Sequence, residues 1–156
     1  MEKNRKGLFS YLSLILFSIF LYSCSMPKIV VLKDPLSAEE HNNLGVAYEK
    51  KGILDLAEKE YNKAIRKKPD WDIPYFNLGN IYYKKGNLKK ALQFYKKAVE
   101  LNPDNTDALN NMAYVYYLLK DYNKAYYYIK KALSKKLKSE YLQTMKEIEE
   151  KIYESD

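Results

Sequence analysis

The chain has 156 residues and a formal net charge of +7, with 27 lysine and arginine residues against 20 aspartate and glutamate residues. This length suits one domain with a short appendage. Because there is one cysteine and one histidine, an intramolecular disulfide, a multi-cysteine metal site and most histidine-based catalytic sites are excluded. The positive charge is spread along the chain, so it is not by itself a signature of nucleic-acid binding.

The first 23 residues have the pattern of a secretory signal peptide. Lys3, Arg5 and Lys6 form a basic front, and residues 8–22 are apolar apart from three serines. At about 1.5 Å per residue, this apolar segment makes a helix of roughly 22 Å. A spanning helix prefers about 20 residues, so the segment is short for one. A short apolar core behind a basic front predicts that the rest of the chain is exported.

The only cysteine follows this apolar segment directly. Leu21-Tyr22-Ser23-Cys24 resembles the bacterial lipobox, with leucine at −3, a small serine at −1 and cysteine at +1. The resemblance implies that the Cys24 thiol receives a diacylglyceryl group and that a peptidase cuts before it. Several acyl chains make a stable anchor where one is marginal. Ser25 at +2 favours, by the same resemblance, the outer membrane of a Gram-negative cell. An uncleaved membrane helix and an ordinary cleaved signal peptide are the alternatives.

Residues 24–36 are expected to form a short tether, and the helices begin after it. Ser37 followed three residues later by Glu40 is a capping box, which predicts a helix that starts at Ala38. From there one skeleton recurs every 34 residues, in units of about 38–71, 72–105 and 106–139, so that residues 37–138 hold all three. The turn inside each unit is marked by a residue that can adopt positive φ, or by a residue that can cap the second helix. These residues are Gly52, Gly86, Asn87 and Asp121.

Small, aromatic and proline residues recur at fixed places in the units. Leu44-Gly45 and Leu78-Gly79 are matched by Met112-Ala113 in the third unit. Small residues are expected where two helices approach closely, and bulky residues between the helices of one unit or toward the next unit. The other repeated positions are Tyr48, Tyr82 and Tyr116; Ala57, Ala91 and Ala125; Tyr61, Tyr95 and Ile129; Ala64, Ala98 and Ala132; and Pro69 and Pro103.

This pattern resembles the tetratricopeptide repeat, a helix-turn-helix unit of 34 residues. The resemblance implies an all-α fold, a right-handed α-solenoid of three such units. Residues 139–156 are expected to cap the stack with a seventh helix. Its apolar stripe is Tyr141, Leu142, Met145, Ile148 and Ile152. Where the family has tryptophan, the chain has His41, Tyr75 and Leu109, so we expect His41 to pack rather than to bind a ligand.

In this family the first helices of the units line a concave groove that binds another protein or a peptide. Amide side chains can hydrogen-bond an extended peptide backbone, and tyrosine rings offer rigid contact area. The alternative is that several of these residues are simply family consensus. By position, the resemblance assigns to the groove Asn42, Val46, Glu49, Phe76, Asn77, Asn80, Tyr83, Asn110, Asn111, Tyr114 and Tyr117.

Some members of the family grip a peptide's terminal carboxylate with two lysines, one arginine and two asparagines. The matching positions here are Asn42, Val46, Asn77, Asp107 and Asn111. Only Asn77 agrees, all three cations are missing, and the carboxylate of Asp107 would repel another. We therefore expect no clamp for a carboxylate tail.

Lysine doublets follow the repeat and are expected at the turns and on the convex side. They either face solvent or contact an anionic surface such as lipid. The doublets are Lys84-Lys85, Lys89-Lys90, Lys96-Lys97, Lys130-Lys131 and Lys135-Lys136.

No nucleotide loop, catalytic triad or metal-ligand spacing is visible, so the sequence predicts neither an enzyme nor a cofactor. We expect an exported, lipid-anchored scaffold for protein–protein interaction that helps to assemble a cell-envelope complex, in the manner of a pilotin or an outer-membrane-assembly accessory. The expected partners are a protein or peptide in the groove and the membrane through Cys24, without nucleic acid or a small-molecule substrate. The alternatives are a membrane-anchored structural protein that self-associates, and an adaptor that regulates a cell-wall enzyme.

Overall fold

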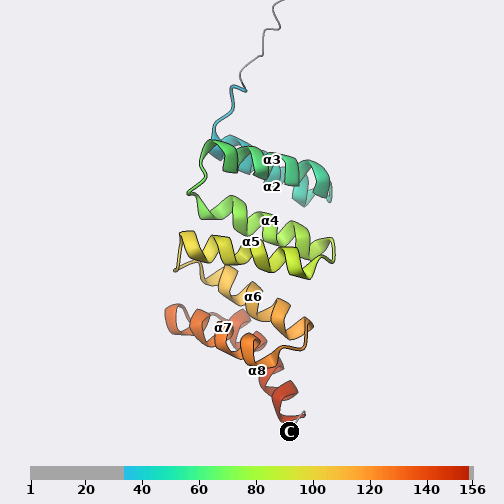
Figure 1. Cartoon of the computed structure of the whole chain (residues 1–156), viewed down its shortest axis with the longest axis vertical. Helices are drawn as coiled ribbons and strands as arrows, with labels where there is room; N and C mark the ends of the chain where they lie inside the picture. The colour runs from blue at the N-terminus through green and yellow to red at the C-terminus, as the bar shows by residue number, and fades with distance from the viewer. Residues whose placement is uncertain (1–33, 155–156) are drawn as a thin grey trace, which may run out of the picture. The chain divides into compact units, whose positions relative to one another are not determined.

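The computed structural model describes residues 34–154, so Cys24, the predicted signal peptide and most of the predicted tether lie outside the described residues. The described part consists of seven α-helices without a strand (Figure 1). None of these helices is long and apolar enough to cross a membrane. The helices are α2 (Ala38–Lys50), α3 (Leu54–Lys67), α4 (Asp72–Lys84), α5 (Leu88–Leu101), α6 (Thr106–Leu118), α7 (Tyr122–Lys135) and α8 (Ser139–Tyr153).

The helices stack in chain order within one compact unit, residues 35–156 (Figure 1). They pack as three pairs, α2 with α3, α4 with α5 and α6 with α7, and α8 packs on α6 and α7. Helices α4 and α6 start at Asp72 and Thr106, one 34-residue step apart. The predicted all-α solenoid of three helical pairs and a final helix is confirmed.

The turn inside each unit has the same backbone but not the same residue. Gly52 and Gly86 have φ angles of 74° and 75°, as expected for glycines that end the first helix. In the third unit Lys120 takes the equivalent place, with a φ of 61°. A side chain with a Cβ is strained in this left-handed region, at a cost of roughly 1 kcal/mol relative to glycine. The third turn therefore carries strain that the first two avoid.

Helix starts follow the capping residues where the chain has them. Ser37 accepts a hydrogen bond from the Glu40 backbone N–H, and the Glu40 carboxylate accepts one from the Ser37 backbone, which is the predicted capping box. Asn87 and Asp121 cap α5 and α7 as predicted, since each side chain accepts a backbone N–H three residues on. Ile53 holds this place before α3 and makes no side-chain cap.

The close approach of paired helices depends on a match between one small residue and one ring. A Cβ added at Gly79 would lie 2.3 Å from the Tyr95 ring, and one added at Gly45 would lie 2.5 Å from the Tyr61 ring. The third unit has Ala113 in place of the glycine and the smaller Ile129 in place of the ring, and both are fully buried. The glycine is thus needed wherever an aromatic ring faces it.

The same bulky residues also join consecutive units, as predicted. Tyr61 shares a buried cluster with Leu78 and Ile81 of α4. Tyr95 and Ile129 have the same role toward α6 and α8. Since every unit buries its apolar surface against the next, the stack has a continuous core.

Two further expectations, for His41 and for the stripe of α8, hold only in part. His41 is fully buried, as a packing residue should be, but its Nδ1 lies 2.7 Å from Glu60 Oε2, so it also forms a polar link to α3. In α8, Leu142 was expected in the apolar stripe and is instead 48% exposed. Thr144 is buried in that helix, since it lies on the side that faces the stack. The stripe is therefore narrower than the sequence pattern indicates.

Candidate functional site

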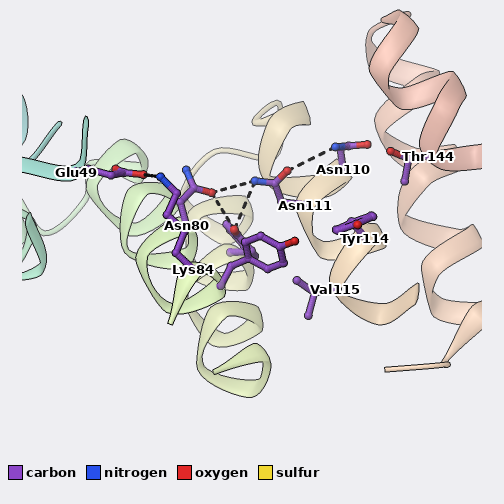
Figure 2. A pocket seen from close by; sticks show the side chains of 10 residues that line it. Glu49, Asn80, Lys84, Asn110, Asn111, Tyr114, Val115 and Thr144 are labelled. Atoms are coloured by element: carbon purple, nitrogen blue, oxygen red, sulfur yellow. Dashed lines mark hydrogen bonds and ion pairs between the residues drawn. The ribbon is translucent and has the colours of Figure 1, made fainter. Parts of the chain in front are cut away.

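A pocket of about 420 Å³ opens along the first helices of the units (Figure 2). Helices α2, α4, α6 and α8 contribute to it, and α5 adds one tyrosine. Glu49 and Thr144 lie at opposite ends of the pocket in the view of Figure 2. The lining residues are Glu49, Asn80, Tyr83, Lys84, Tyr95, Asn110, Asn111, Tyr114, Val115 and Thr144.

Asparagine amides connect consecutive first helices along this side. Asn80 Oδ1 accepts hydrogen bonds from the Tyr95 hydroxyl at 2.8 Å and from Asn111 Nδ2 at 3.0 Å, which joins α4 to α6. One step earlier, Asn77 Nδ2 donates to Asn42 Oδ1 at 2.9 Å and joins α2 to α4. These asparagines therefore also hold the units together, a role that the sequence did not indicate.

The far end of this amide chain leaves one acceptor without a bond. Asn110 Nδ2 donates to Asn111 Oδ1 at 3.5 Å, so that the Asn110 oxygen points toward Thr144 (Figure 2). The Thr144 hydroxyl donates to the Glu140 carbonyl at 3.0 Å and does not donate to this oxygen. Among residues 34–154 no group donates to Asn110 Oδ1, although the atom is buried. A buried acceptor without a bond costs free energy, which a ligand N–H could recover.

The two charged residues of the pocket neutralise each other. Lys84 Nζ lies 2.7 Å from Glu49 Oε1, and the Tyr61 hydroxyl donates to Glu49 Oε2 at 2.7 Å. Burial and then the neighbouring Glu49 carboxylate raise the pKa of Tyr61 well above its usual range, so its hydroxyl remains a donor. Lys84 belongs to a doublet that was expected at the turns and on the convex side. Lys84 does lie next to a turn, at the end of α4, but its ammonium reaches Glu49 in the pocket and not the convex side.

Tyrosine rings form the apolar part of the wall. The Tyr83 and Tyr114 ring centroids lie 6.1 Å apart at 65°, an edge-to-face pair, and Tyr114 stacks on Tyr117 at 6.0 Å. Burial, together with Tyr114, raises the pKa of Tyr83. Both effects favour the neutral phenol, so the wall offers ring faces and hydroxyl groups without charge.

The structure brings six of the eleven predicted groove residues into this pocket, namely Glu49, Asn80, Tyr83, Asn110, Asn111 and Tyr114. Phe76 instead borders a neighbouring hollow and faces the Tyr95 ring at 6.0 Å. Asn42 and Asn77 are buried between helices, and Val46 packs against the core of the first two units. Tyr117 reaches the site through its contact with Tyr114.

Four lining residues were not predicted as groove residues: Lys84, Tyr95, Val115 and Thr144. The sequence places Tyr95 in the core, and its ring is buried there, but its hydroxyl reaches Asn80. Thr144 belongs to α8, which lies outside the repeat, so no family position could mark it. A search of the second helices for ring hydroxyls would have found Tyr95.

The carboxylate of Asp107 carries its own counter-ion. Burial raises the pKa of Asp107, but hydrogen bonds from Lys138 and Tyr141 outweigh it and hold the pKa below its usual range. Lys138 Nζ lies 2.5 Å from Asp107 Oδ1. Asp107 therefore repels a peptide carboxylate less strongly than the sequence suggests. The three positions where the clamp has lysine or arginine still hold other residues in this chain. In the described chain, no group of His, Cys, Asp and Glu side chains is placed to hold a metal ion.

Comparison with known proteins agrees with this architecture. A family model described as TPR repeat matches residues 54–86 and 79–120. No curated protein matches the chain. Among solved structures, the chain is similar to the first TPR of Spaghetti (RPAP3) bound to the HSP90 peptide SRMEEVD, with 20% identity and a TM-score of 0.72 over 79% of this chain and 98% of that one. At this identity the likeness concerns the fold alone. The family match shows that residues 54–120 are tetratricopeptide repeats, and the shared fold agrees with this over the rest of the helical stack.

Proposed function

We propose that the chain is an adaptor that binds a segment of another protein in the pocket between α4, α6 and α8. The observation that carries the proposal is an open pocket of about 420 Å³ whose wall combines tyrosine rings with asparagine amides. Ring faces give contact area at low entropic cost, and amides can bond a peptide backbone. The similar solved repeat was determined with a bound peptide, which supports this use of the fold.

The bound segment is uncharged and internal to its chain. Lys84 is held by Glu49, so the pocket has no free cation for a terminal carboxylate and no free carboxylate for a lysine or arginine. A charge brought into the pocket would lose hydration without gaining a partner. An N–H group of the segment, by contrast, would give Asn110 Oδ1 the bond that it lacks, after a small rotation of the amide. The expectation that no carboxylate clamp exists stays a prediction.

The adaptor operates in the cell envelope, anchored by acyl chains on Cys24. The lipobox-like sequence Leu21-Tyr22-Ser23-Cys24 supports this placement. Its role there is assembly of an envelope complex, pilotin-like or similar to outer-membrane-assembly accessories. Mass spectrometry of the mature N-terminus tests the anchor: an acylated Cys24 agrees with it, whereas an intact Met1 contradicts it.

Crosslinking in intact membranes, followed by capture of the chain, tests the adaptor role. The double variant Tyr83→Ala/Tyr114→Ala removes both rings of the pocket wall. Tyr75→Ala/Tyr153→Ala removes the same number of rings from half-exposed and exposed positions outside it. We expect the first variant to lose partners that the second retains. Equal capture by both variants would refute the pocket as the binding site, and capture mainly of a second copy of the chain would favour self-association.

A further inference from the structure

The second helices of the last two units carry an excess of positive charge that the pocket does not use. Helix α5 has four lysines and one glutamate, and α7 has four lysines and no acidic residue. By contrast, the first helix α6 has one aspartate and no lysine or arginine. The positive charge is therefore concentrated on α5 and α7.

Helices α5 and α7 are the second helices of consecutive units, and their side chains border the same core clusters. Val99 of α5 packs against the cluster that contains Ile129, and Tyr128 of α7 packs against the cluster that contains Tyr95. Because the repeat is 34 residues long, Lys96-Lys97 and Lys130-Lys131 stand at the same height on the two helices. We call the exposed side of these two helices the α5–α7 outer face. It consists of Lys89, Gln93, Lys96, Lys97, Glu100, Asn123, Tyr127, Lys130, Lys131 and Ser134, all exposed or half-exposed, and Glu100 is its one acidic residue.

Most lysines of this face lack an acidic partner, unlike many lysines elsewhere in the described chain. Lys97 lies 3.6 Å from Glu100, but no carboxylate of residues 34–154 pairs with the four others. At the helix ends, in contrast, Lys85 lies 2.6 Å from Asp55 and Lys135 lies 2.6 Å from Asp104. The unpaired members are Lys89, Lys96, Lys130 and Lys131.

Tyrosine rings accompany the lysines on α7. Tyr127 is 59% exposed, and with Tyr126 it borders a shallow hollow that Lys130 and Lys131 also line. The Lys130 ammonium lies 5.2 Å from the centre of the Tyr126 ring. A tyrosine has an apolar body and a polar tip, which suits the boundary between lipid and water. Lysines attract the phosphate groups of anionic lipids at the same depth.

We propose that the α5–α7 outer face docks on an anionic phospholipid surface. The charge is spread over two helices as a broad face, and its exposed tyrosine can enter the headgroup layer. Both features fit a membrane better than a single extended polyanion, which would need a groove lined by cations. The proposal rests neither on the pocket nor on an acyl chain at Cys24.

Residues 34–156 suffice for the test, because residues 35–156 are one compact unit with its own core. Co-sedimentation is measured with vesicles of phosphatidylcholine, with and without phosphatidylglycerol, at low and high salt. We expect binding only to the vesicles that contain phosphatidylglycerol, and a steep loss with salt. Lys96→Gln/Lys130→Gln should weaken this binding about tenfold or more. Lys50→Gln/Lys51→Gln removes the same charge at the end of α2 and should weaken it far less.

Soluble polyphosphate serves as the second probe. Tyr127→Ser should weaken vesicle binding and leave polyphosphate binding unchanged, since only the bilayer offers an apolar layer to the ring. Absence of binding to phosphatidylglycerol, or an equal loss in the two lysine variants, would overturn the proposal. Polyphosphate binding that is as tight as vesicle binding and indifferent to Tyr127 would assign the face to polyanions instead.

Discussion

The match between Gly79 and the Tyr95 ring gives the sharpest prediction about the fold. An alanine at position 79 would place its Cβ 2.3 Å from ring carbons that are almost fully buried. The ring would have to move by about 1 Å in a close-packed core, and such overpacking costs about 1–3 kcal/mol. Helix propensity returns up to about 1 kcal/mol of this for Gly79→Ala. We therefore expect a net destabilisation of about 1–2 kcal/mol.

The third unit supplies the matched background for this test. There Ala113 faces Ile129, so Gly79→Ala/Tyr95→Ile reproduces a pair that the chain already tolerates. Tyr95→Ile alone loses the hydroxyl bond to Asn80 and ring volume, and we expect it to cost about 2–4 kcal/mol. When position 95 is already isoleucine, Gly79→Ala should be neutral or stabilising. The coupling energy between positions 79 and 95 is then about 2 kcal/mol.

Urea unfolding followed by circular dichroism of the wild type, both single variants and the double variant gives this coupling energy. The denaturant slopes must agree between variants for the comparison to hold. An equal cost of Gly79→Ala with tyrosine or isoleucine at position 95 would refute the claim that the ring requires the glycine.

Three further predictions concern single positions. Lys120→Gly should stabilise the chain by about 1 kcal/mol, because Lys120 holds a positive φ. Lys51→Gly should not stabilise it, since φ is −84° at that position. Equal shifts of the melting temperature in the two variants would contradict the claim that Lys120 is strained. Ile53→Asn should raise the free energy of unfolding by about 1 kcal/mol, because an asparagine there could cap α3. The φ of −87° and ψ of 70° at Ile53 are close to those of Asn87, which caps α5. An unchanged free energy of unfolding would show that the missing cap of α3 is already compensated. The pKa of Asp107 is lowered in the folded chain, so its contribution to stability is present above the unfolded value and is lost as pH falls through the folded value. Thermal unfolding at falling pH should therefore show a smaller loss for Asp107→Asn than for the wild type, and identical profiles would contradict this assignment.

The repeat pattern predicts the fold because each signature residue has a local structural cause. Glycine marks a positive φ, asparagine and aspartate mark a helix start, and small residues mark a close approach between helices. Lys120 shows the limit of this logic, because the backbone of its turn is imposed by the neighbouring helices rather than by the residue itself. The same packing explains why Ala113 can replace glycine only beside Ile129.

The candidate site was only partly predictable, because it depends on contacts between units. The period of 34 residues places the asparagines on one side, but Asn77 pairs with Asn42 and Asn111 pairs with Asn80. These pairs are 35 and 31 residues apart, so they depend on the offset between stacked helices, which a repeat pattern does not contain. Thr144 enters the site from α8, outside the repeat.

The central claim is that a partner binds in the pocket lined by Tyr83 and Tyr114. Photo-crosslinking from inside the pocket tests it most directly, with p-benzoylphenylalanine at position 83 and, as a control, at the exposed position 153. The account predicts a covalent adduct with a partner protein from position 83 in membranes and none from position 153. An adduct from position 153 without one from position 83 would contradict it.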